Sequence, residues 1–203
     1  MAIQSGRSKS MKRDMQWAIW QIVVFGILTT LMMAASATGW ADQSDERLDK
    51  LFDRLRTTAD PLEAQIIEVQ IWRIWTDSGR DDINALVEEG SRSMAQGIPK
   101  DAIAIFDRVV TALPDFAEGW NKRATAHYLN GDYTVSMIDI ERTLALEPRH
   151  FGAISGMGLI FMVRGDEANA LRAFEEVLKV HPHARGAKAR VEELHKKLKA
   201  QGA

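Results

Sequence analysis

The fold is decided by residues 119–133, which read GWNKRATAHYLNGDY. Trp120, Ala124 and Tyr128 lie four residues apart, a spacing that places side chains on one face of an α-helix. Gly131 follows, and glycine adopts the left-handed conformation that ends many helices without a steric penalty from a Cβ atom. The stretch therefore predicts one helix and the turn that closes it.

A second helix is predicted directly after this turn. Ser136, Ile140 and Leu144 continue the four-residue spacing. Pro148 ends this helix, because proline lacks a backbone N–H and disfavours helical geometry in the residue before it. The small residues Ala124 and Ser136 allow the two helices to approach to about 8–10 Å. The two helices and their turn thus form one helix–turn–helix unit.

The unit recurs along the chain. Five sets of similar residues repeat at a spacing of 34: Pro114, Pro148 and Pro182; Gly97, Gly131 and Gly165; Gly90, Ala124 and Gly158; Ala102, Ser136 and Ala170; Phe106, Ile140 and Phe174. Repetition at this length is typical of solenoids, in which each unit buries its apolar face against its neighbours. The sequence predicts three units, residues 83–116, 117–150 and 151–184, without β-strands.

The unit resembles the tetratricopeptide repeat (TPR), a helix–turn–helix motif of this length. Residues 119–133 match its pattern of tryptophan, small residue and Gly-Asp-Tyr. In the first unit Pro99 replaces the usual aromatic residue after the turn, a position that accepts proline. A second departure is the late small position, which holds Val109, Thr143 and Val177. The resemblance, which extends to periplasmic TPR proteins of Gram-negative bacteria, implies an all-α solenoid of three TPR helix pairs.

Capping helices are predicted on both sides of the repeats, because stacked units leave end faces that terminal elements must cover. Residues 42–82 predict a helix pair packed on the first unit, and Asp60-Pro61 begins its second helix. Residues 185–203 predict a C-terminal capping helix. The apolar stripes expected to face the core are Leu48, Leu51, Phe52 and Leu55; Leu62, Ile66, Val69 and Trp72; and Val191, Leu194 and Leu198.

Two features of these caps have alternative interpretations. We expect Trp72 and Trp75 to pack under the N-terminal cap; the alternative is an exposed docking site. We expect the lysines and arginines of the C-terminal helix to be solvated; the alternative is contact with an anionic lipid or an acidic partner.

Residues 1–41 have the composition of a signal peptide or a membrane anchor. A basic start precedes a largely apolar run from Trp17 to Ala37, and small residues follow. We predict cleavage after Ala41, with Ala37 as the second candidate. The alternative is an uncleaved anchor, because about 20 apolar residues suffice to span a bilayer. Basic residues stay in the cytoplasm in either case, so the expected location of the rest is periplasmic, free or attached to the inner membrane.

The composition argues against several functions. The chain has 26 Lys+Arg, 28 Asp+Glu and no cysteine, so thiolate chemistry is excluded and there is no general case for nucleic-acid binding. No phosphate-binding loop, nucleophile elbow or zinc-protease motif occurs. His181 and His183 flank Pro182 without a third ligand nearby, so we interpret them as turn residues in preference to a metal site. We expect no enzyme, cofactor, metal or small-molecule substrate.

Recognition of another protein is the remaining function. In TPR folds the first helices of successive units line a concave groove. The resemblance places these residues there: Asn84, Val87, Ser91, Met94, Glu118, Asn121, Lys122, Thr125, Tyr128, Ser155, Leu159 and Met162. This surface is polar in the middle and apolar, with methionine, toward its end, which suits an extended peptide or a helix.

One TPR subfamily, the heat-shock co-chaperones, grips acidic peptide C-termini with basic and amide residues. The corresponding positions here are Val87, Ser91, Lys122, Gly152 and Gly156, of which only Lys122 is charged. We therefore do not expect that carboxylate clamp. The sequence predicts a non-catalytic adaptor or scaffold of the bacterial envelope. The alternative is a structural subunit permanently docked in a membrane or periplasmic complex.

Overall fold

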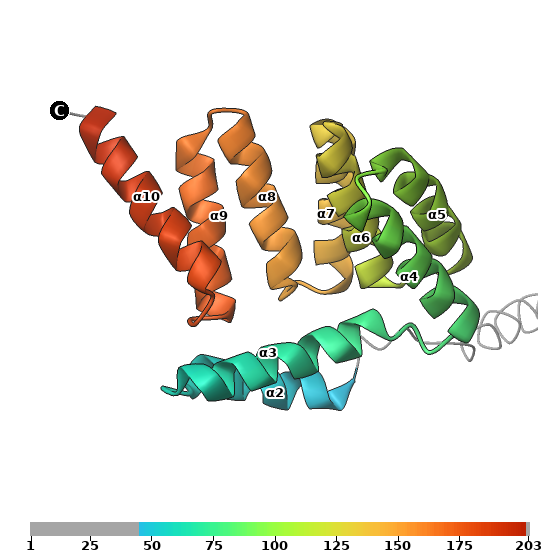
Figure 1. Cartoon of the computed structure of the whole chain (residues 1–203). Coiled ribbons are helices and arrows are strands. Elements are labelled where there is room, and N and C mark those ends of the chain that lie inside the picture. The colour runs from blue at the N-terminus through green and yellow to red at the C-terminus, as the bar shows by residue number, and fades with distance from the viewer. Residues whose placement is uncertain (1–44, 202–203) are drawn as a thin grey trace, which may run out of the picture. The chain divides into compact units, whose positions relative to one another are not determined.

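The structure is a computed structural model that describes residues 45–201; the predicted signal or anchor lies outside them. Every element in this part of the chain is an α-helix (Figure 1). The helices are α2 (Glu46–Thr57), α3 (Pro61–Thr76), α4 (Asp81–Ala95), α5 (Pro99–Ala112), α6 (Ala117–Asn130), α7 (Tyr133–Leu146), α8 (Phe151–Val163), α9 (Glu167–Val180) and α10 (Arg185–Gln201). The predicted all-α solenoid is confirmed for residues 45–201.

Three helix pairs follow one another: α4 with α5, α6 with α7, and α8 with α9. The second helices begin at Pro99, Tyr133 and Glu167, at equal steps of 34 residues. The glycines of the three turns have positive φ angles, 75° at Gly97, 86° at Gly131 and 73° at Gly165. The period read from the sequence is therefore the period of the structure.

Within a pair, a small residue on the first helix faces a large one on the second. A Cβ atom added to Gly158 would lie 2.8 Å from Cζ of Phe174. In the first pair the equivalent distance, from Gly90, is 2.6 Å. The middle pair instead packs Ala124 in one cluster with the smaller Ile140. In each helix pair, the residue on the second helix is thus larger where the facing residue on the first helix is smaller.

We expect Gly158→Leu to lower the free energy of unfolding by on the order of 1–3 kcal/mol or more, because the new side chain must displace a packed phenyl ring. Urea unfolding followed by circular dichroism measures the loss. The matched control is Gly186→Leu, because Gly186 lies in α10 and a Cβ added there meets no atom within 4 Å. Equal losses in the two variants would contradict the predicted contact.

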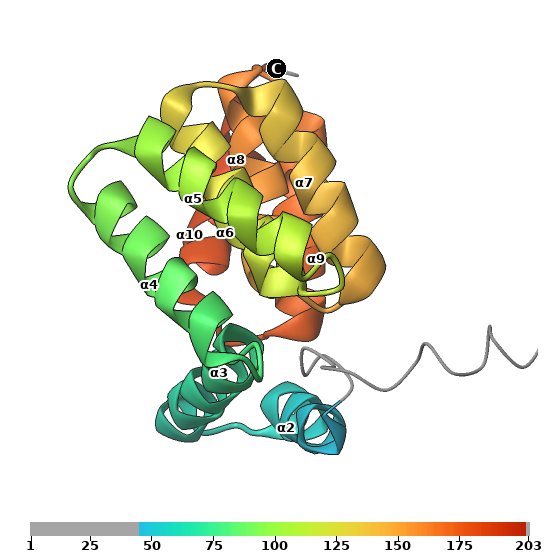
Figure 2. The same cartoon turned by 90° about the vertical axis from the view of Figure 1, so that its right-hand side faces the viewer.

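The N-terminal helix pair packs on the third unit, and not on the first as the sequence analysis expected. Phe52 and Trp75 contact Phe151 with ring centroids 6.5 and 5.0 Å apart. One core cluster joins α2 and α3 with α8, α9 and α10, and Figures 1 and 2 show the pair lying beneath the array of α4 to α10. The aromatic rings explain the difference, because they bury the largest apolar areas and find their partner, Phe151, at the start of α8.

Polar contacts hold this pair against the loops between units. Arg149 donates through Nη1 to Oδ1 of Asp49 at 2.6 Å. His183 donates through Nε2 to the carbonyl oxygen of Thr58 at 2.9 Å. The loops that join α7 to α8 and α9 to α10 therefore serve as attachment points for α2 and α3.

The apolar stripe predicted for α3 is wrong in part. Leu62, Ile66 and Val69 were expected to face the core but are 65%, 53% and 52% exposed. The buried residues are Ala64, Ile67, Ile71, Ile74 and Trp75. Because α3 is apolar on two faces, its spacing does not select between them, and the face that carries Trp75 buries more area.

The other predicted stripes agree with the structure. Leu48, Phe52 and Leu55 of α2 are buried, and Leu194 is the buried centre of the α10 stripe. Trp75 is 2% exposed, and Trp72 packs against the same cluster, so both tryptophans belong to the core. No helix within residues 45–201 combines the length and hydropathy needed to cross a membrane.

Candidate functional site

Nine of the twelve residues predicted to form a groove border two clefts along the first helices of the units. The first cleft has a volume of about 500 Å³ and lies among the end of α3, α4 and α6. Its lining is Thr76, Asp77, Asn84, Val87, Glu88, Ser91, Arg92 and Lys122. Carboxylates and cations are both present, so this cleft is polar without a dominant charge.

The second cleft is smaller and less polar. It has a volume of about 150 Å³ and lies among α6, α7 and α8. Its lining is Asn121, Ala124, Thr125, Tyr128, Ser136, Ile140, Gly152, Ala153, Ser155, Gly156 and Leu159. A cavity of this size accommodates a benzene-sized group. The second cleft therefore has room for one apolar side chain between polar edges.

Asn84 fixes one wall of the first cleft. Its Oδ1 accepts a hydrogen bond from the backbone N–H of Ser78 at 2.9 Å, and its Nδ2 donates to Oδ1 of Asp77 at 3.1 Å. The backbone N–H of Gly79, and then the Asn84 amide, lower the pKa of Asp77. The linker between α3 and α4 thus presents an ionised carboxylate at the cleft.

The other three predicted residues, Met94, Glu118 and Met162, lie outside both clefts. The two methionines pack at the edges of the cores. Glu118 differs most from expectation, because it is 1% exposed. Val87 and Asn121 border the clefts but are also nearly buried. Glu118 therefore supports the groove from beneath and does not offer a contact to a partner.

Glu118 is the centre of a buried polar network. Its Oε2 accepts hydrogen bonds from Nδ2 of Asn121 at 2.8 Å and from Nε2 of His150 at 3.0 Å. Its Oε1 lies 3.3 Å from Nζ of Lys122. Nδ1 of His150 accepts from the backbone N–H of Ala153 at 3.2 Å, so the proton of a neutral ring is on Nε2. His150 thereby caps α8 and donates to Glu118.

The network keeps Glu118 ionised. Burial raises the pKa of this carboxyl group, but the hydrogen bond from His150, the Lys122 ammonium and the Asn121 amide together outweigh burial and hold the pKa below its usual range. A buried carboxylate with these donors ties α6 to the start of α8.

The same network reaches the N-terminal helix pair. The indole of Trp75 stacks on the His150 ring with centroids 4.2 Å apart and an interplanar angle of 10°. The path Trp75–His150–Glu118–Lys122 therefore runs from α3 to the first cleft. The position of α3 and the shape of the groove depend on the same buried side chains.

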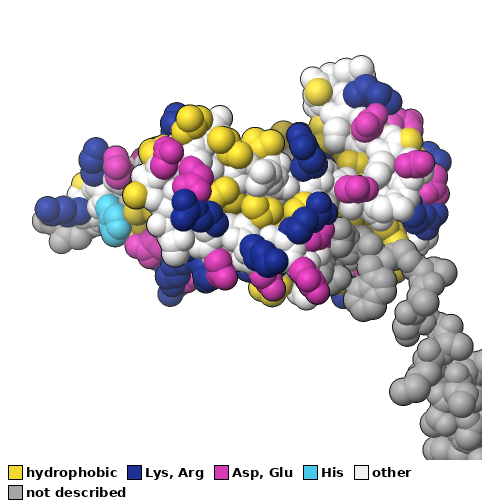
Figure 3. All heavy atoms as spheres, turned by 90° about the horizontal axis from the view of Figure 1, so that it is seen from below, with side chains coloured by type: hydrophobic (Ala, Val, Ile, Leu, Met, Phe, Trp, Pro, Cys, Tyr) yellow, Lys and Arg dark blue, Asp and Glu magenta, His cyan; other side chains and the backbone are white. Residues whose placement is uncertain are grey.

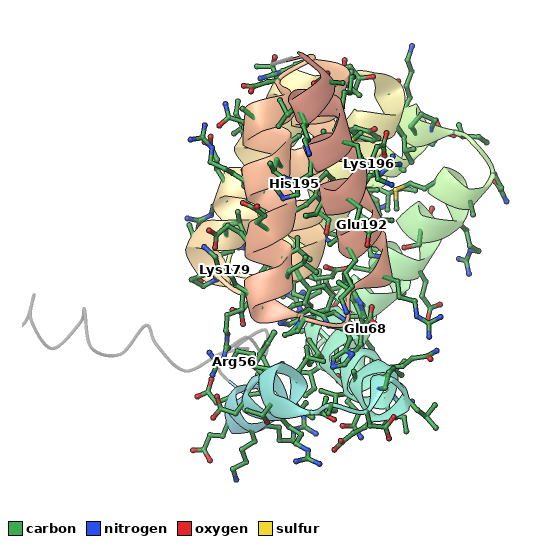
Figure 4. All side chains as sticks on the ribbon, turned by 90° about the vertical axis from the view of Figure 1, so that its left-hand side faces the viewer. Arg56, Glu68, Lys179, Glu192, His195 and Lys196 are labelled. Carbon is green, nitrogen blue, oxygen red and sulfur yellow. The ribbon has the colours of Figure 1, made fainter. Side chains whose placement is uncertain are left out.

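A third cleft, of about 470 Å³, lies between α3, α8 and the start of α10. It shares Gly152 and Ser155 with the second cleft, so the two adjoin along α8. His181 lies at its edge, nearly buried, with Nε2 3.1 Å from Oε2 of Glu68. This hydrogen bond is the main reason that the pKa of Glu68 is lowered. Figure 4 shows Glu68 where α3 meets the lower end of α10.

The two histidines of the 181–183 turn hold different partners. His181 contacts Glu68 and His183 contacts the Thr58 carbonyl. Within residues 45–201, no group of three or more His, Cys, Asp or Glu side chains comes together as a metal site. Both histidines act as ties between the N-terminal pair and the turn before α10.

His150 was missed by the sequence analysis. The residues that precede the three units at the 34-residue spacing are Asp82, Phe116 and His150. Because one of them is charged, one is apolar and one is an imidazole, this column does not mark His150 as buried. Its partner gave a clearer signal, because Glu118 is the charged member of a column that otherwise holds Asn84 and Gly152, and a buried charge needs a partner.

Comparison with known proteins defines the class. Residues 87–150 match the family model described as tetratricopeptide repeat. Over 153 residues the chain is 39% identical to a TPR repeat-containing protein of Rhizobium etli, and the match covers 75% of this chain and 75% of that protein. The chain therefore belongs to the tetratricopeptide repeat family.

Two solved structures share its fold. The first TPR of Spaghetti (RPAP3), bound to the HSP90 peptide SRMEEVD, has a TM-score of 0.54 at 22% identity and covers 57% of this chain and 92% of that chain. The Yersinia enterocolitica type III secretion chaperone SycD, in complex with a peptide of the translocator YopD, has a TM-score of 0.54 at 10% identity. That match covers 58% of this chain and 95% of that chain.

Proposed function

We propose that this protein is a non-catalytic adaptor that binds a peptide or helix of another protein in the groove formed by the first and second clefts. This proposal rests on the two clefts along α4, α6 and α8, whose lining includes nine of the residues that the TPR resemblance places in the groove. The peptide complexes of the two structural neighbours support it by analogy of fold.

The groove chemistry narrows the class of ligand. The second cleft offers Tyr128 and Leu159 to one apolar side chain. On α8, the missing Cβ atoms of Gly152 and Gly156 leave room for the protein's own side chains: a Cβ added there would lie 2.8 Å from Trp72 and 3.4 Å from Ile140, respectively. The first cleft offers charges of both signs. A segment with one apolar anchor next to polar residues of mixed charge fits this surface best.

We also propose that the protein acts outside the cytoplasm. The basic start and the apolar run that follows support export, and the absence of cysteine is compatible with an oxidising compartment. N-terminal sequencing of the protein from fractionated cells tests this proposal: a cytoplasmic pool with an intact leader would contradict it.

Site-specific photocrosslinking in the source organism tests the groove. A photoreactive amino acid at Thr125, which is exposed at the second cleft, should give a discrete adduct with a partner. The matched position is Ile138, which is 57% exposed on α7 and borders neither cleft. Tyr128→Ala should reduce the Thr125 adduct severalfold, because it removes the apolar wall of the cleft.

Two crosslinking results would contradict groove binding. One is the same set of adducts from Thr125 and Ile138, and the other is an unchanged adduct yield at Thr125 in a folded Tyr128→Ala variant. Asn121→Ala is a poor probe, because Asn121 donates to the buried Glu118 carboxylate and its loss disturbs the fold.

A further inference from the structure

The outer face of α3 is an apolar surface that no described residue covers. Leu62, Ile66 and Val69 are all more than half exposed and occur at spacings of four and three, so they form one stripe. Within residues 45–201 they are three of the eight exposed large hydrophobic residues. Figure 3, which views the side formed by α2 and α3, shows hydrophobic side chains in a band with charged groups along its edges.

The acidic residues of α3 are engaged elsewhere. Oε1 of Glu63 accepts from Nε of Arg54 on α2 at 2.5 Å, and Glu68 bonds to His181 beside the third cleft. The exposed residues that flank the stripe are the amides Gln65 and Gln70 and the cation Arg73. The outer face of α3 therefore presents aliphatic groups, amides and one positive charge, without an acidic group.

The sequence before α2 is the second observation that points to a membrane. The run from Trp17 to Ala37 is apolar enough in sequence to remain in a bilayer as an anchor, and α2 begins at Glu46. The eight residues 38–45 that join this run to α2 reach about 29 Å at most when fully extended. In the anchored protein, the α2–α3 pair is therefore held close to the membrane surface.

We propose that, in the anchored form of the exported protein, α3 lies on the bilayer with Leu62, Ile66 and Val69 in the interface and Arg73 toward anionic headgroups. Three aliphatic side chains are a weak membrane signal on their own. Stable membrane attachment takes two signals, and here the tether would supply the second by raising the effective concentration of the helix at the surface.

The chemistry of the stripe favours a bilayer over a second copy of the chain. Stable protein interfaces bury about 800 Å² per partner and use aromatic or arginine anchors in pockets. The stripe is a single helix face with three aliphatic residues, and the aromatic residues of α3 are turned into the core. A lipid surface needs neither a pocket nor matching shape.

A probe placed on the stripe tests the proposal. Because the chain has no cysteine, Ile66→Cys and Ile138→Cys each carry one labelling site. The two isoleucines are matched in type and in exposure, 53% and 57%. Each full-length variant is labelled with an environment-sensitive fluorophore and reconstituted into phosphatidylcholine–phosphatidylglycerol vesicles, with and without nitroxide-labelled lipid. We expect a blue shift and severalfold stronger quenching at position 66 than at position 138.

Each other outcome overturns the proposal. Water-like emission from both probes would show that α3 does not touch the bilayer. A blue shift at position 66 that grows with protein density and is insensitive to the lipid nitroxide would assign the stripe to a second copy. Failure of the full chain to float with the vesicles would exclude the anchor itself and leave the groove proposal, which the photocrosslinking tests separately.

Discussion

Glu118→Ala should lower the free energy of unfolding by about 3 kcal/mol, because it leaves the buried donors of His150 and Asn121 without their acceptor. Removal of the carboxylate should also loosen the contact between α6 and the start of α8, since His150 is the N-cap of α8. Chemical denaturation measures the free energy, and hydrogen exchange of the α8 amides reports the local effect.

Glu118→Gln is the matched control for this prediction. A glutamine oxygen can still accept from His150 and Asn121, so we expect a loss of only about 1 kcal/mol at neutral pH. The free energy should also depend less on pH in this variant. Since the folded pKa of Glu118 is lowered, its carboxylate stabilises the fold above the ordinary glutamate range, and this contribution is lost as the pH falls. Equal stability of the alanine variant and the wild type would refute the network.

Trp75→Ala should lower the free energy of unfolding by about 3–5 kcal/mol, because it removes a large buried side chain that contacts Phe52, His150 and Phe151. These contacts hold the N-terminal helix pair on the third unit. We expect the amides of α2 and α3 to lose protection from hydrogen exchange before those of α4 to α7.

Two variants control for this effect. Trp75→Phe keeps an aromatic ring and removes an indole N–H that has no acceptor among the described residues, so its cost should be smaller. Leu62→Ala, on the exposed face of the same helix, should change the free energy by less than about 0.5 kcal/mol. If the amides of α4 and α5 lost protection from hydrogen exchange before those of α2 and α3 in Trp75→Ala, the packing of α2–α3 on the third unit would be contradicted.

The repeat was predictable because its signals are backbone requirements. A glycine with positive φ in each turn and a proline after each pair recur at a fixed spacing, and neither depends on distant partners. The expectation that Thr125, Tyr128 and Leu159 border a cleft came from the TPR resemblance, which that period supports. Pairings such as Glu118 with His150 could not be predicted in this way, because burial of a charge depends on which donors the tertiary fold brings near it.

The α3 stripe was mispredicted for a related reason. Spacing identifies the faces of a helix, but when two faces are apolar only the partner decides which one is buried. That partner was Phe151, 76 residues after Trp75 in the chain. Nothing local to α3 carries this information.

The attachment of α2–α3 to the third unit has a consequence for the order of folding. Residues 45–76 are synthesised before the rest of the described residues, yet their core partners in α8, α9 and α10 emerge last. Neighbouring units of a linear array can fold as they appear, but contacts of high sequence separation must wait for closure of the long intervening loop. We therefore expect α2 and α3 to stay undocked on the nascent polypeptide until synthesis of the chain is nearly finished.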